Sequence, residues 1–485
     1  MLFNSLAFAI FLPIVFFLYW ALPNKYRPFW ILITSYYFYM SWNVKYVVLI
    51  LFTTVVSYGC AICMQRWKKK KTVLLWSTLI ASLGVLFFFK YFNFFSLSAA
   101  SLLGRFAIPL HPITLSLMLP VGISFYTFQT LSYVIDVYRG DVEPEKNFLT
   151  YAAFISFFPQ LVAGPIERTS NLLPQIKGEH RFDREKATYG LLLMAWGFFK
   201  KLVVADNLAV YADQIFDDVH YYGGFSMLLA ALFFTFQIYC DFSGYSDIAI
   251  GCARLFDINL MTNFKSPYFA LSIKDFWSRW HISLSTWFRD YVYIPLGGNR
   301  VSKMRNAFNL LVTFLVSGLW HGAAWHFVVW GGLHGVLQVA ENWLPFMRKL
   351  TARAKEDLRS ARGPIVWLCR AVTFVIAMLA WVFFRAGSVS DACYVLLHMW
   401  DGILSPGTYF ARGMYDFGMK TADVISLLVP LVLLLWFDYT ALYEDPILKL
   451  RRCKRPVRWV VYYGFVFLVL MLASFNAQEF VYFQF

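Results

Sequence analysis

The chain has 485 residues, of which 59% are hydrophobic and 20% aromatic, and its mean hydropathy is +0.56. This apolar content lies above the roughly 45–50% of a soluble domain and excludes an ordinary soluble protein. Lys and Arg number 43 against 28 Asp and Glu, for a net charge of +15. Because the basic residues cluster between apolar runs, the excess indicates positively charged cytoplasmic loops of a membrane protein rather than nucleic-acid binding.

Repeated apolar runs, each long enough to cross a hydrocarbon core about 30 Å thick, predict an all-α polytopic membrane protein. About 11–12 transmembrane helices are expected in a single transmembrane domain over residues 1–485. The predicted spans cover residues 5–22, 28–41, 44–65, 72–90, 115–136, 187–204, 225–250, 306–320, 323–342, 364–384, 424–438 and 459–475. Counting crossings so that Lys- and Arg-rich connections fall on the cytoplasmic side leaves both termini outside.

One apolar run does not fit the count as a simple span. Residues 148–164 are interrupted by Pro159, and the charge count requires this run to enter the membrane and return. We therefore predict a re-entrant segment, which is tolerated at membrane depth only where protein or a water-filled cavity lines it.

Charged residues also fall inside two predicted spans. Lys200 and Lys201 indicate either a polar interior or a span that ends earlier at the surface. Asp241 and Asp247 lie at the inner end of the span over 225–250, where carboxylates pair with a cation or line a cavity. The sequence leaves open which pairs form.

The connection over residues 253–305 is rich in aromatic residues, and its segment 274–291 predicts an amphipathic helix in or under the cytoplasmic leaflet. One face of this helix would be aromatic and apolar, with Trp277, Trp280, Leu284, Trp287, Phe288 and Tyr291, and a separate strip would be polar, with Lys274, Ser278, His281 and Ser285. The alternative is an interfacial anchor without a chemical role.

His321 lies in one of the most apolar stretches, SGLWHGAAWHFVVWGGLHG, residues 317–335. An imidazole titrates near neutrality, and burial favours its neutral, proton-accepting form, so His321 is the best candidate for a general base. Gly318 and Gly322 beside it allow close backbone approach. A structural histidine bonded to a carbonyl group is the alternative.

The other histidines of this region have plainer interpretations. His281, on the expected polar strip, is the second candidate for chemistry. His326 and His334 are expected to pack or to form hydrogen bonds. Because no acidic or thiolate ligand lies near these histidines and His321 in sequence, we predict no metal site.

Several ordered motifs resemble the membrane-bound O-acyltransferase superfamily, in particular the bacterial branch that O-acetylates cell-surface polysaccharides such as alginate and peptidoglycan. The strongest are DFWSRWHISLSTWFRDYVYIPLGGNR at 275–300 and SGLWHGAAWHFVVWGGLHG at 317–335. The resemblance extends over most of the chain, through FLPIVFFLYW (11–20), LPVGISFYTFQTLSYVIDVYRGD (119–141), FFPQLVAGPIER (157–168), QIYCDFSGYSDIAIG (237–251) and FVYFQF (480–485).

The resemblance implies a multi-helix ring with a central tunnel, in the bacterial cytoplasmic (inner) membrane, and a catalytic region within about 253–305. The invariant histidine of the family matches His321, and a more variable polar position matches His281. The expected reaction takes an acetyl group from a cytoplasmic thioester donor, acetyl-CoA, with His321 as base and His281 orienting the donor. Trp280, Ser285 and Arg289 are expected to bind that donor.

The resemblance also implies partners on the outer face. In many such systems an extracytoplasmic partner of the serine-esterase type receives the acetyl group and passes it to the surface polysaccharide. The topology places the tail after the last span, within 459–485, outside the membrane. Related systems have a C-terminal aromatic-tyrosine motif proposed to carry the acyl group, so Tyr482 is expected to be that carrier. An interfacial aromatic belt is the alternative.

Two other functions remain open at this point. One is transfer of a different acyl group, such as D-alanine, to teichoic acid, although the C-terminal extension favours acetyl transfer. The other is a transporter or proton relay, because intramembrane His, Asp and Lys residues are typical of both. The lack of internal repeats argues against a transporter.

Overall fold

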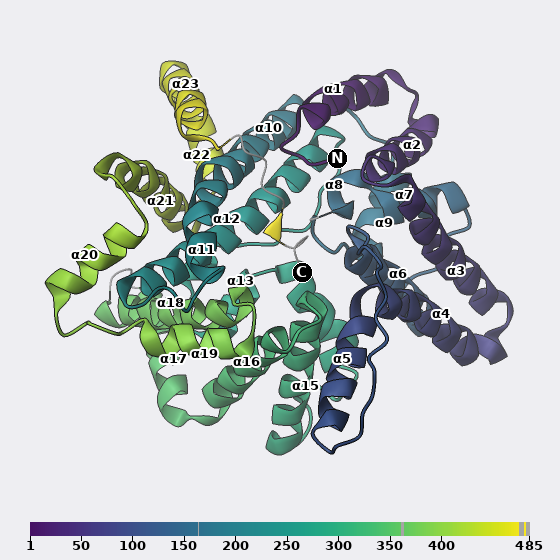
Figure 1. The fold of residues 1–485 in the computed structure, drawn as a ribbon. Helices are drawn as coiled ribbons and strands as arrows, with labels where there is room; N and C mark the ends of the chain where they lie inside the picture. The colour runs from purple at the N-terminus through teal and green to yellow at the C-terminus, as the bar shows by residue number, and fades with distance from the viewer. Residues whose placement is uncertain (163, 360–362, 475–479, 482–485) are drawn as a thin grey trace. The chain divides into compact units, whose positions relative to one another are not determined.

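A computed structural model describes residues 1–162, 164–359, 363–474 and 480–481 (Figure 1). Every regular element in these ranges is helical, which confirms the prediction of an all-α fold. By internal contacts the chain divides into two compact units. The first comprises residues 1–194 and 246–261, and the second comprises residues 195–245 and 262–485.

The first unit is built mainly from the N-terminal helices. These are α1 (Leu6–Ala21), α2 (Arg27–Met40), α3 (Val47–Arg66), α4 (Lys71–Leu86), α5 (Phe92–Gly104), α6 (Ile123–Arg139), α7 (Phe148–Ser156), α8 (Phe158–Leu161), α9 (Thr169–Lys177) and most of α10 (Arg184–Phe198). Helices α3, α4 and α6 pack against one another (Figure 1). The apolar run 148–164 is broken between α7 and α8 at Phe157, just before Pro159, and both helices are buried. This break agrees with the interrupted helix expected there.

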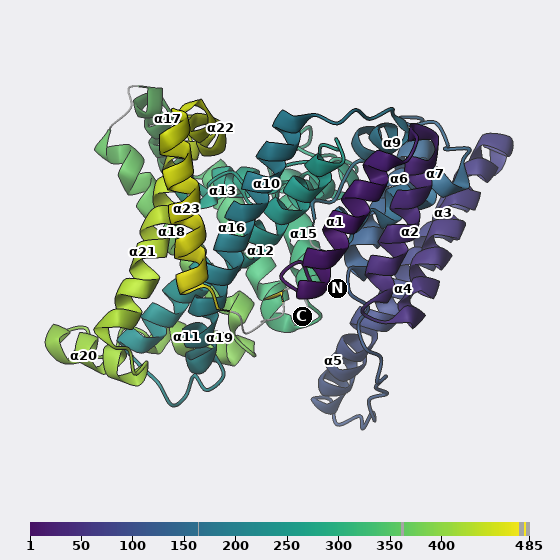
Figure 2. The same ribbon diagram turned by 90° about the horizontal axis from the view of Figure 1, so that it is seen from above.

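The second unit holds the remaining helices and the candidate site. They are α11 (Asp206–Phe216), most of α12 (Phe225–Leu255), α13 (Ile273–Arg279), α14 (Ile282–Phe288), α15 (Lys303–His321), α16 (Trp325–Trp343), α17 (Pro345–Arg359), α18 (Pro364–Arg385), α19 (Val389–His398), α20 (Pro406–Asp416), α21 (Thr421–Ala441), α22 (Pro446–Arg452) and α23 (Arg455–Leu472). Two π-helical segments, Phe199–Ala205 and Arg289–Tyr293, interrupt it, and α21 and α23 both contact the first of them (Figure 2).

Seven helical stretches in the described part of the chain are long and apolar enough to cross a membrane. They are Val44–Arg66, Lys68–Gly104, Arg184–Phe216, Phe225–Leu255, Pro364–Arg385, Thr421–Ala441 and Arg455–Leu472. Each matches a predicted span. The other predicted spans correspond to α1, α2, α6, α15 and α16, which are shorter or more polar.

Two predicted helices differ from the structure. The helix expected over 115–136 begins only at Ile123. Residues 108–120 form no regular structure and contain Pro109, Pro112 and Pro120, which lack the backbone N–H of a helix. The single amphipathic helix expected over 274–291 is wrong as well, since the chain forms two short helices, α13 and α14, that meet at Trp280 and His281.

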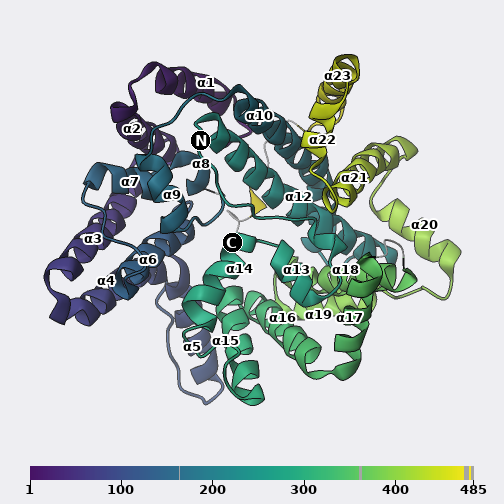
Figure 3. The ribbon, with the colours of Figure 1, turned by 180° about the vertical axis from the view of Figure 1, so that it is seen from behind.

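Helices α15 and α16 form a close antiparallel pair (Figure 3). Gly318 and Gly331 face each other at the contact, where a Cβ atom on Gly318 would lie 2.3 Å from the Phe327 carbonyl oxygen. A Cβ atom on Gly322 would lie 2.0 Å from the Phe327 ring. The close approach expected at Gly318 and Gly322 is therefore confirmed, and it fixes the end of α15 that carries His321.

Candidate active site

His321 is the last residue of α15 and is 2% exposed. Its Nδ1 atom lies 2.7 Å from the carbonyl oxygen of Ser317, one turn earlier. A carbonyl oxygen can only accept a hydrogen bond, so Nδ1 carries the proton and Nε2 is the basic nitrogen of the neutral ring. A hydrogen bond to a carbonyl group is what we expected of a structural histidine. Here the same bond leaves Nε2 unprotonated, so that this nitrogen can act as a base.

Aromatic rings surround the imidazole of His321. The rings of Trp320, Trp330 and Phe384 lie 5.0, 4.8 and 5.6 Å from it, centroid to centroid. The negative end of the α15 dipole lies at the same helix terminus. Proton uptake at Nε2 would therefore create a cation next to partial negative charge, which favours the protonated product of a general-base step.

His281 stands between α13 and α14 with φ of +43°, in the left-handed region that residues with a Cβ atom rarely adopt. Its side chain is fully buried, so the prediction that it lines a polar strip is wrong. Neither ring nitrogen has a hydrogen-bond partner among the residues that the structure describes. Burial, and secondarily the nearby His321, hold the pKa of His281 well below its ordinary value, so the ring is neutral.

Asn263 holds the turn at His281 in place. Its backbone carbonyl accepts a hydrogen bond from the Ile282 N–H at 2.9 Å, and its side-chain Oδ1 accepts one from the Ser283 hydroxyl at 2.6 Å. Both groups belong to the first turn of α14, where the backbone donors have no partner within the helix. A helix period read within 274–291 could not reveal this contact, because Asn263 lies outside that segment.

The two histidines belong to one aromatic cluster. The Trp320 ring contacts both, at centroid distances of 6.1 Å to His281 and 5.0 Å to His321. On its other side His281 packs edge to face against Phe242 of α12, at 4.6 Å. The fold therefore brings together the two histidines that the sequence singled out, which are 40 positions apart.

A cavity of about 520 Å³ lies between α14, α15 and α16. Ser317, whose carbonyl group accepts the His321 hydrogen bond, lies on its wall. Ser285 and Arg289, two of the residues expected to bind the donor, also line it.

Trp280, the third residue expected to bind the donor, does not line this cavity. It is fully buried in the aromatic core, against Phe276, Tyr268 and Trp381. The backbone turn at His281 directs Trp280 inward, so it supports the site from behind instead of facing the cavity.

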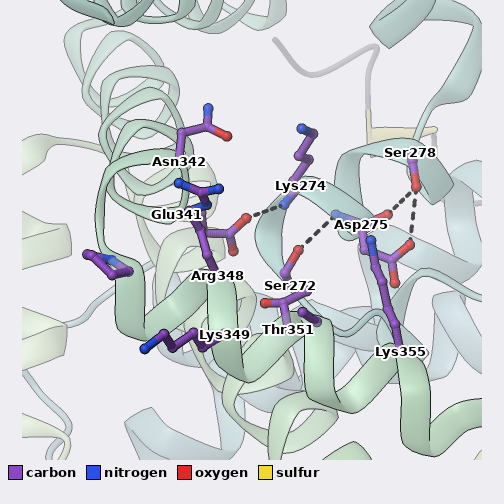
Figure 4. Close-up of a pocket in the computed structure, with 12 residues that line it drawn as sticks. Ser272, Lys274, Asp275, Ser278, Glu341, Asn342, Arg348, Lys349, Thr351 and Lys355 are labelled. Carbon is purple, nitrogen blue, oxygen red and sulfur yellow. Dashed lines mark hydrogen bonds between the residues drawn. The ribbon is translucent and has the colours of Figure 1, made fainter.

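A second cavity, of about 790 Å³, lies between α13, the end of α16 and α17 (Figure 4). It shares Lys274 and Asn342 with the first cavity, so the two adjoin. Its cationic lining was not anticipated from the sequence, because it joins residues of two distant helices, Lys274 with Arg348, Lys349 and Lys355.

The two carboxylates in this second cavity are engaged within the protein. Glu341 accepts hydrogen bonds from the backbone N–H groups of Ile273 and Lys274, at 2.6 and 3.0 Å, and so caps α13 (Figure 4). Asp275 pairs with Arg279, at 2.9 Å. The four cations of the lining form no ion pair within the described ranges, and they leave a net positive cavity.

The remaining histidines of the region form hydrogen bonds, as predicted. His326 Nδ1 donates to the Phe383 carbonyl at 2.9 Å, and His334 Nδ1 accepts from the Trp277 indole N–H at 3.2 Å. No group of three His, Cys, Asp or Glu side chains is arranged for a metal ion in the part of the chain that the structure describes. Tyr482, the expected acyl carrier, lies outside the described residues.

The intramembrane charges noted in the sequence form a pair in the second unit. Lys201 Nζ lies 2.6 Å from Asp241 Oδ1, and both residues are 1% exposed. Lys200 is buried too, and its Nζ donates to the Ser243 hydroxyl at 2.8 Å. Of the two possibilities for these lysines, the polar interior is therefore correct. Each charge could be noted in the sequence, but the pairing could not, since the partners lie on different helices.

Comparison with known proteins decides the family. A model of the membrane-bound O-acyltransferase (MBOAT) family matches residues 31–383. The chain belongs to the membrane-bound O-acyltransferase family. This confirms the resemblance read from the motifs, and with the apolar helices it makes the chain a multi-pass membrane protein and an acyltransferase, whose reaction requires an acyl donor.

Individual MBOAT relatives are similar over much of their length. The chain is 37% identical to "Probable alginate O-acetylase AlgI" of Pseudomonas aeruginosa, over 92% of this chain and 83% of that protein. It is 39% identical to the peptidoglycan O-acetyltransferase of Helicobacter pylori, over 82% and 80%. It is 30% identical to the teichoic acid D-alanyltransferase of Streptococcus thermophilus, over 57% of this chain and 71% of that protein.

Proposed function

We propose that this MBOAT enzyme O-acetylates a cell-surface polysaccharide such as alginate or peptidoglycan, with acetyl-CoA as the donor. The support is that relatives named for O-acetylation match 82–92% of the chain, whereas the D-alanyltransferase matches 57%. The observation that carries the chemistry is the hydrogen bond from His321 Nδ1 to the Ser317 carbonyl, at the wall of the 520 Å³ cavity.

In the proposed reaction His321 acts as the general base. Its Nε2 accepts the proton of an acceptor hydroxyl while the hydroxyl oxygen attacks the acetyl carbonyl carbon of the thioester. The carbon–sulfur bond then breaks, and the thiol leaves with the proton that His321 returns. Negative charge on the C-terminal end of α15 stabilises the intervening imidazolium. His281 stays neutral and orients the donor.

The adjoining cavities favour a donor that carries phosphate groups. The 790 Å³ cavity provides unpaired Lys and Arg side chains, which bind phosphate through charge-assisted hydrogen bonds. The 520 Å³ cavity adjoins it, is lined by Ser285 and Arg289, and has on its wall Ser317, the hydrogen-bond partner of His321. We propose that the nucleotide end of acetyl-CoA occupies the 790 Å³ cavity and its thioester arm the 520 Å³ cavity.

The rest of the reaction path stays a prediction. The enzyme is expected in the bacterial cytoplasmic (inner) membrane, with both termini outside, as a single domain that encloses a central tunnel. An extracytoplasmic partner of the serine-esterase type would receive the acetyl group and pass it to the polymer. Tyr482 would carry the acetyl group between His321 and that partner.

Labelled acetyl-CoA supplied to the cytoplasmic face of proteoliposomes tests the proposal. Covalent label on the protein or on polymer is the expected result, and free label in the lumen would instead indicate a transporter. His321→Ala should abolish covalent transfer while the protein remains in the membrane, and full activity of that variant would contradict the assignment of the base.

Tyr482→Phe tests the carrier separately. It removes the hydroxyl that would form the ester and keeps the aromatic ring, so polymer acetylation should be lost. Wild-type acetylation in this variant would contradict the carrier role and favour the alternative, an interfacial aromatic belt. D-alanylated carrier protein in place of acetyl-CoA tests the second acyl donor.

A further inference from the structure

A buried ion cluster in the second unit has no role in the reaction described so far. Lys201 Nζ lies 2.8 Å from Asp206 Oδ1 and 2.6 Å from Asp241 Oδ1, and all three residues are 1% exposed. The three groups come from the π-helical segment Phe199–Ala205, from α11 and from α12. Buried charges are costly unless every one is paired, so a cluster of one cation with two carboxylates calls for a further partner.

That partner is the backbone near the end of the sequence. The second oxygen of Asp241, Oδ2, accepts a hydrogen bond from the backbone N–H of Val481 at 2.8 Å. Val481 and the preceding Phe480 are 5% and 0% exposed. A carboxylate that keeps its charge binds an N–H group more strongly than a neutral acceptor does. Lys201 occupies Oδ1 and so leaves Oδ2 for Val481.

The segment held in this way lies next to the histidine cluster. The Phe480 ring packs on Phe242 and Tyr245 of α12, at centroid distances of 5.6 and 4.6 Å. Phe242 also packs against His281, at 4.6 Å. One aromatic ring therefore separates Phe480 from the left-handed turn that carries His281.

The same stretch of chain is attached before this point as well. The Ser474 N–H donates to the Leu202 carbonyl at 2.9 Å, and the Asn207 side-chain amide donates to the Leu472 carbonyl at 2.8 Å. These contacts bring the end of α23 to the helix that carries Lys201. The Asp241 contact then fixes the chain again at residues 480–481.

We propose that Lys201 and Asp241 are positioning residues that hold residues 480–481 behind Phe242 and so support His281. Asp241 acts through the Val481 N–H, and Phe480 acts through the ring against which His281 packs. This inference relies on the proposed function only in placing the reaction at His281 and His321. The alternative is that the ion cluster merely joins two helices.

Two pairs of variants separate these possibilities. Val481→Pro removes the N–H donor and leaves the buried charges intact, while Val481→Ala keeps the donor and serves as its control. Asp241→Ala removes the acceptor, while Asp206→Ala removes the other carboxylate of Lys201 without touching Val481. A thermal melt in detergent would reveal whether the Asp241 variant folds. If it does not, the Val481→Pro and Val481→Ala pair alone tests whether Asp241 anchors residues 480–481.

Hydrogen exchange followed by mass spectrometry gives a readout that does not depend on catalysis. In Val481→Pro and Asp241→Ala the peptide over residues 473–485 should exchange about tenfold faster than in the paired controls, as expected for loss of a hydrogen bond to a charged group. Equal exchange within the Val481 pair would overturn the anchoring.

Kinetics test the positioning role. Val481→Pro should lower kcat for acetyl transfer relative to Val481→Ala, with little change in KM for acetyl-CoA. Faster exchange with unchanged kcat would overturn the link to His281. If His321→Ala were active, the proposed function would fail, but the exchange result would still decide whether Asp241 anchors this segment.

Discussion

His281 carries two local costs at once. Its left-handed backbone conformation is strained by about 1–3 kcal/mol for a residue with a Cβ atom. Its buried ring also lacks a hydrogen-bond partner among the described residues, although buried polar groups are normally paired. Such strain persists only where the surrounding structure imposes it, here through Asn263. Strained, desolvated residues of this kind cluster at functional sites, which supports a chemical role for His281.

The burial of His281 predicts a pH dependence of stability. The folded protein keeps this ring neutral because its pKa is lowered, whereas the unfolded chain binds a proton below the ordinary pKa of 6.5. The free energy of unfolding should therefore fall as pH drops below 6.5. In His281→Gln the slope should be smaller by up to about 1.4 kcal/mol per pH unit. Thermal melts in detergent between pH 7 and about pH 5 measure it.

The exposed His111 provides the control for this experiment. His111→Gln removes an exposed imidazole of the first unit, and the slope of His281→Gln is compared with the slope of this variant. If the profile of His281→Gln also matched the wild type, the ring of His281 would have to titrate equally in the folded and unfolded protein.

At the scale of elements, the α15–α16 pair determines where the base lies. Gly318 and Gly331 let the two backbones meet near the C-terminal end of α15. Any side chain there would push the helices apart and shift His321 relative to Trp330 on α16 and Phe384 on α18. The position of the proposed catalytic base thus depends on the absence of side-chain atoms at Gly318, one turn away.

Gly318→Ala should destabilise the protein by about 1–3 kcal/mol and lower kcat, because its new methyl group would lie 2.3 Å from the Phe327 carbonyl oxygen. Gly332→Ala is the matched control on α16, since its methyl group would meet only Leu315 Cδ2, at an ordinary 3.4 Å. Thermal melts and acetyl-transfer rates compare the two. A Gly318 variant as stable and active as the Gly332 variant would contradict the close contact.

Most elements could be predicted from sequence because the membrane imposes a simple rule, that apolar runs form helices. His321 could be identified for a related reason, since a titratable group in such a run is conspicuous. The turn at His281 could not be predicted, because it depends on a contact with Asn263, which lies in another segment. This contact breaks the regular helix that the pattern of 274–291 predicts. The Lys201–Asp241 pair and the cationic cavity escaped prediction likewise, since each joins side chains of separate helices.

At the scale of the whole molecule, the net charge of +15 has more than one role. Basic loops are expected to set the orientation of the chain in the membrane. Some of the same cations, Lys274 on α13 and Arg348 on α17, also line a cavity that adjoins the site. In the proposed function, basic residues that follow the positive-inside rule would therefore also bind the acyl donor.

Replacing Lys274 and Arg348 by Ala should raise KM for acetyl-CoA by about tenfold, because hydrogen bonds to phosphate are lost. KM for acetyl-pantetheine, which lacks phosphate, should not change. The wild-type KM for acetyl-CoA should also rise with salt concentration, and this dependence should weaken in the double variant. Steady-state kinetics with both donors provide the measurement.

Lys449→Ala on α22 is a suitable control for general charge effects, because this residue lines neither cavity. It removes one positive charge from the same unit, and KM for both donors should stay at the wild-type value. An equal rise in KM for acetyl-pantetheine in the double variant would show that the cavity does not recognise phosphate.

The proton that His321 donates to Ser317 also determines how the residue reacts with electrophiles. Reagents such as diethyl pyrocarbonate acylate the unprotonated nitrogen of an imidazole, which in His321 is Nε2. The ring is 2% exposed, and Ser317 beside it lines the 520 Å³ cavity, so we expect the reagent to arrive from that cavity and a bound donor to block it. Chemical modification at His321 should thus occur at one nitrogen only, and its rate would report how fully the cavity is occupied.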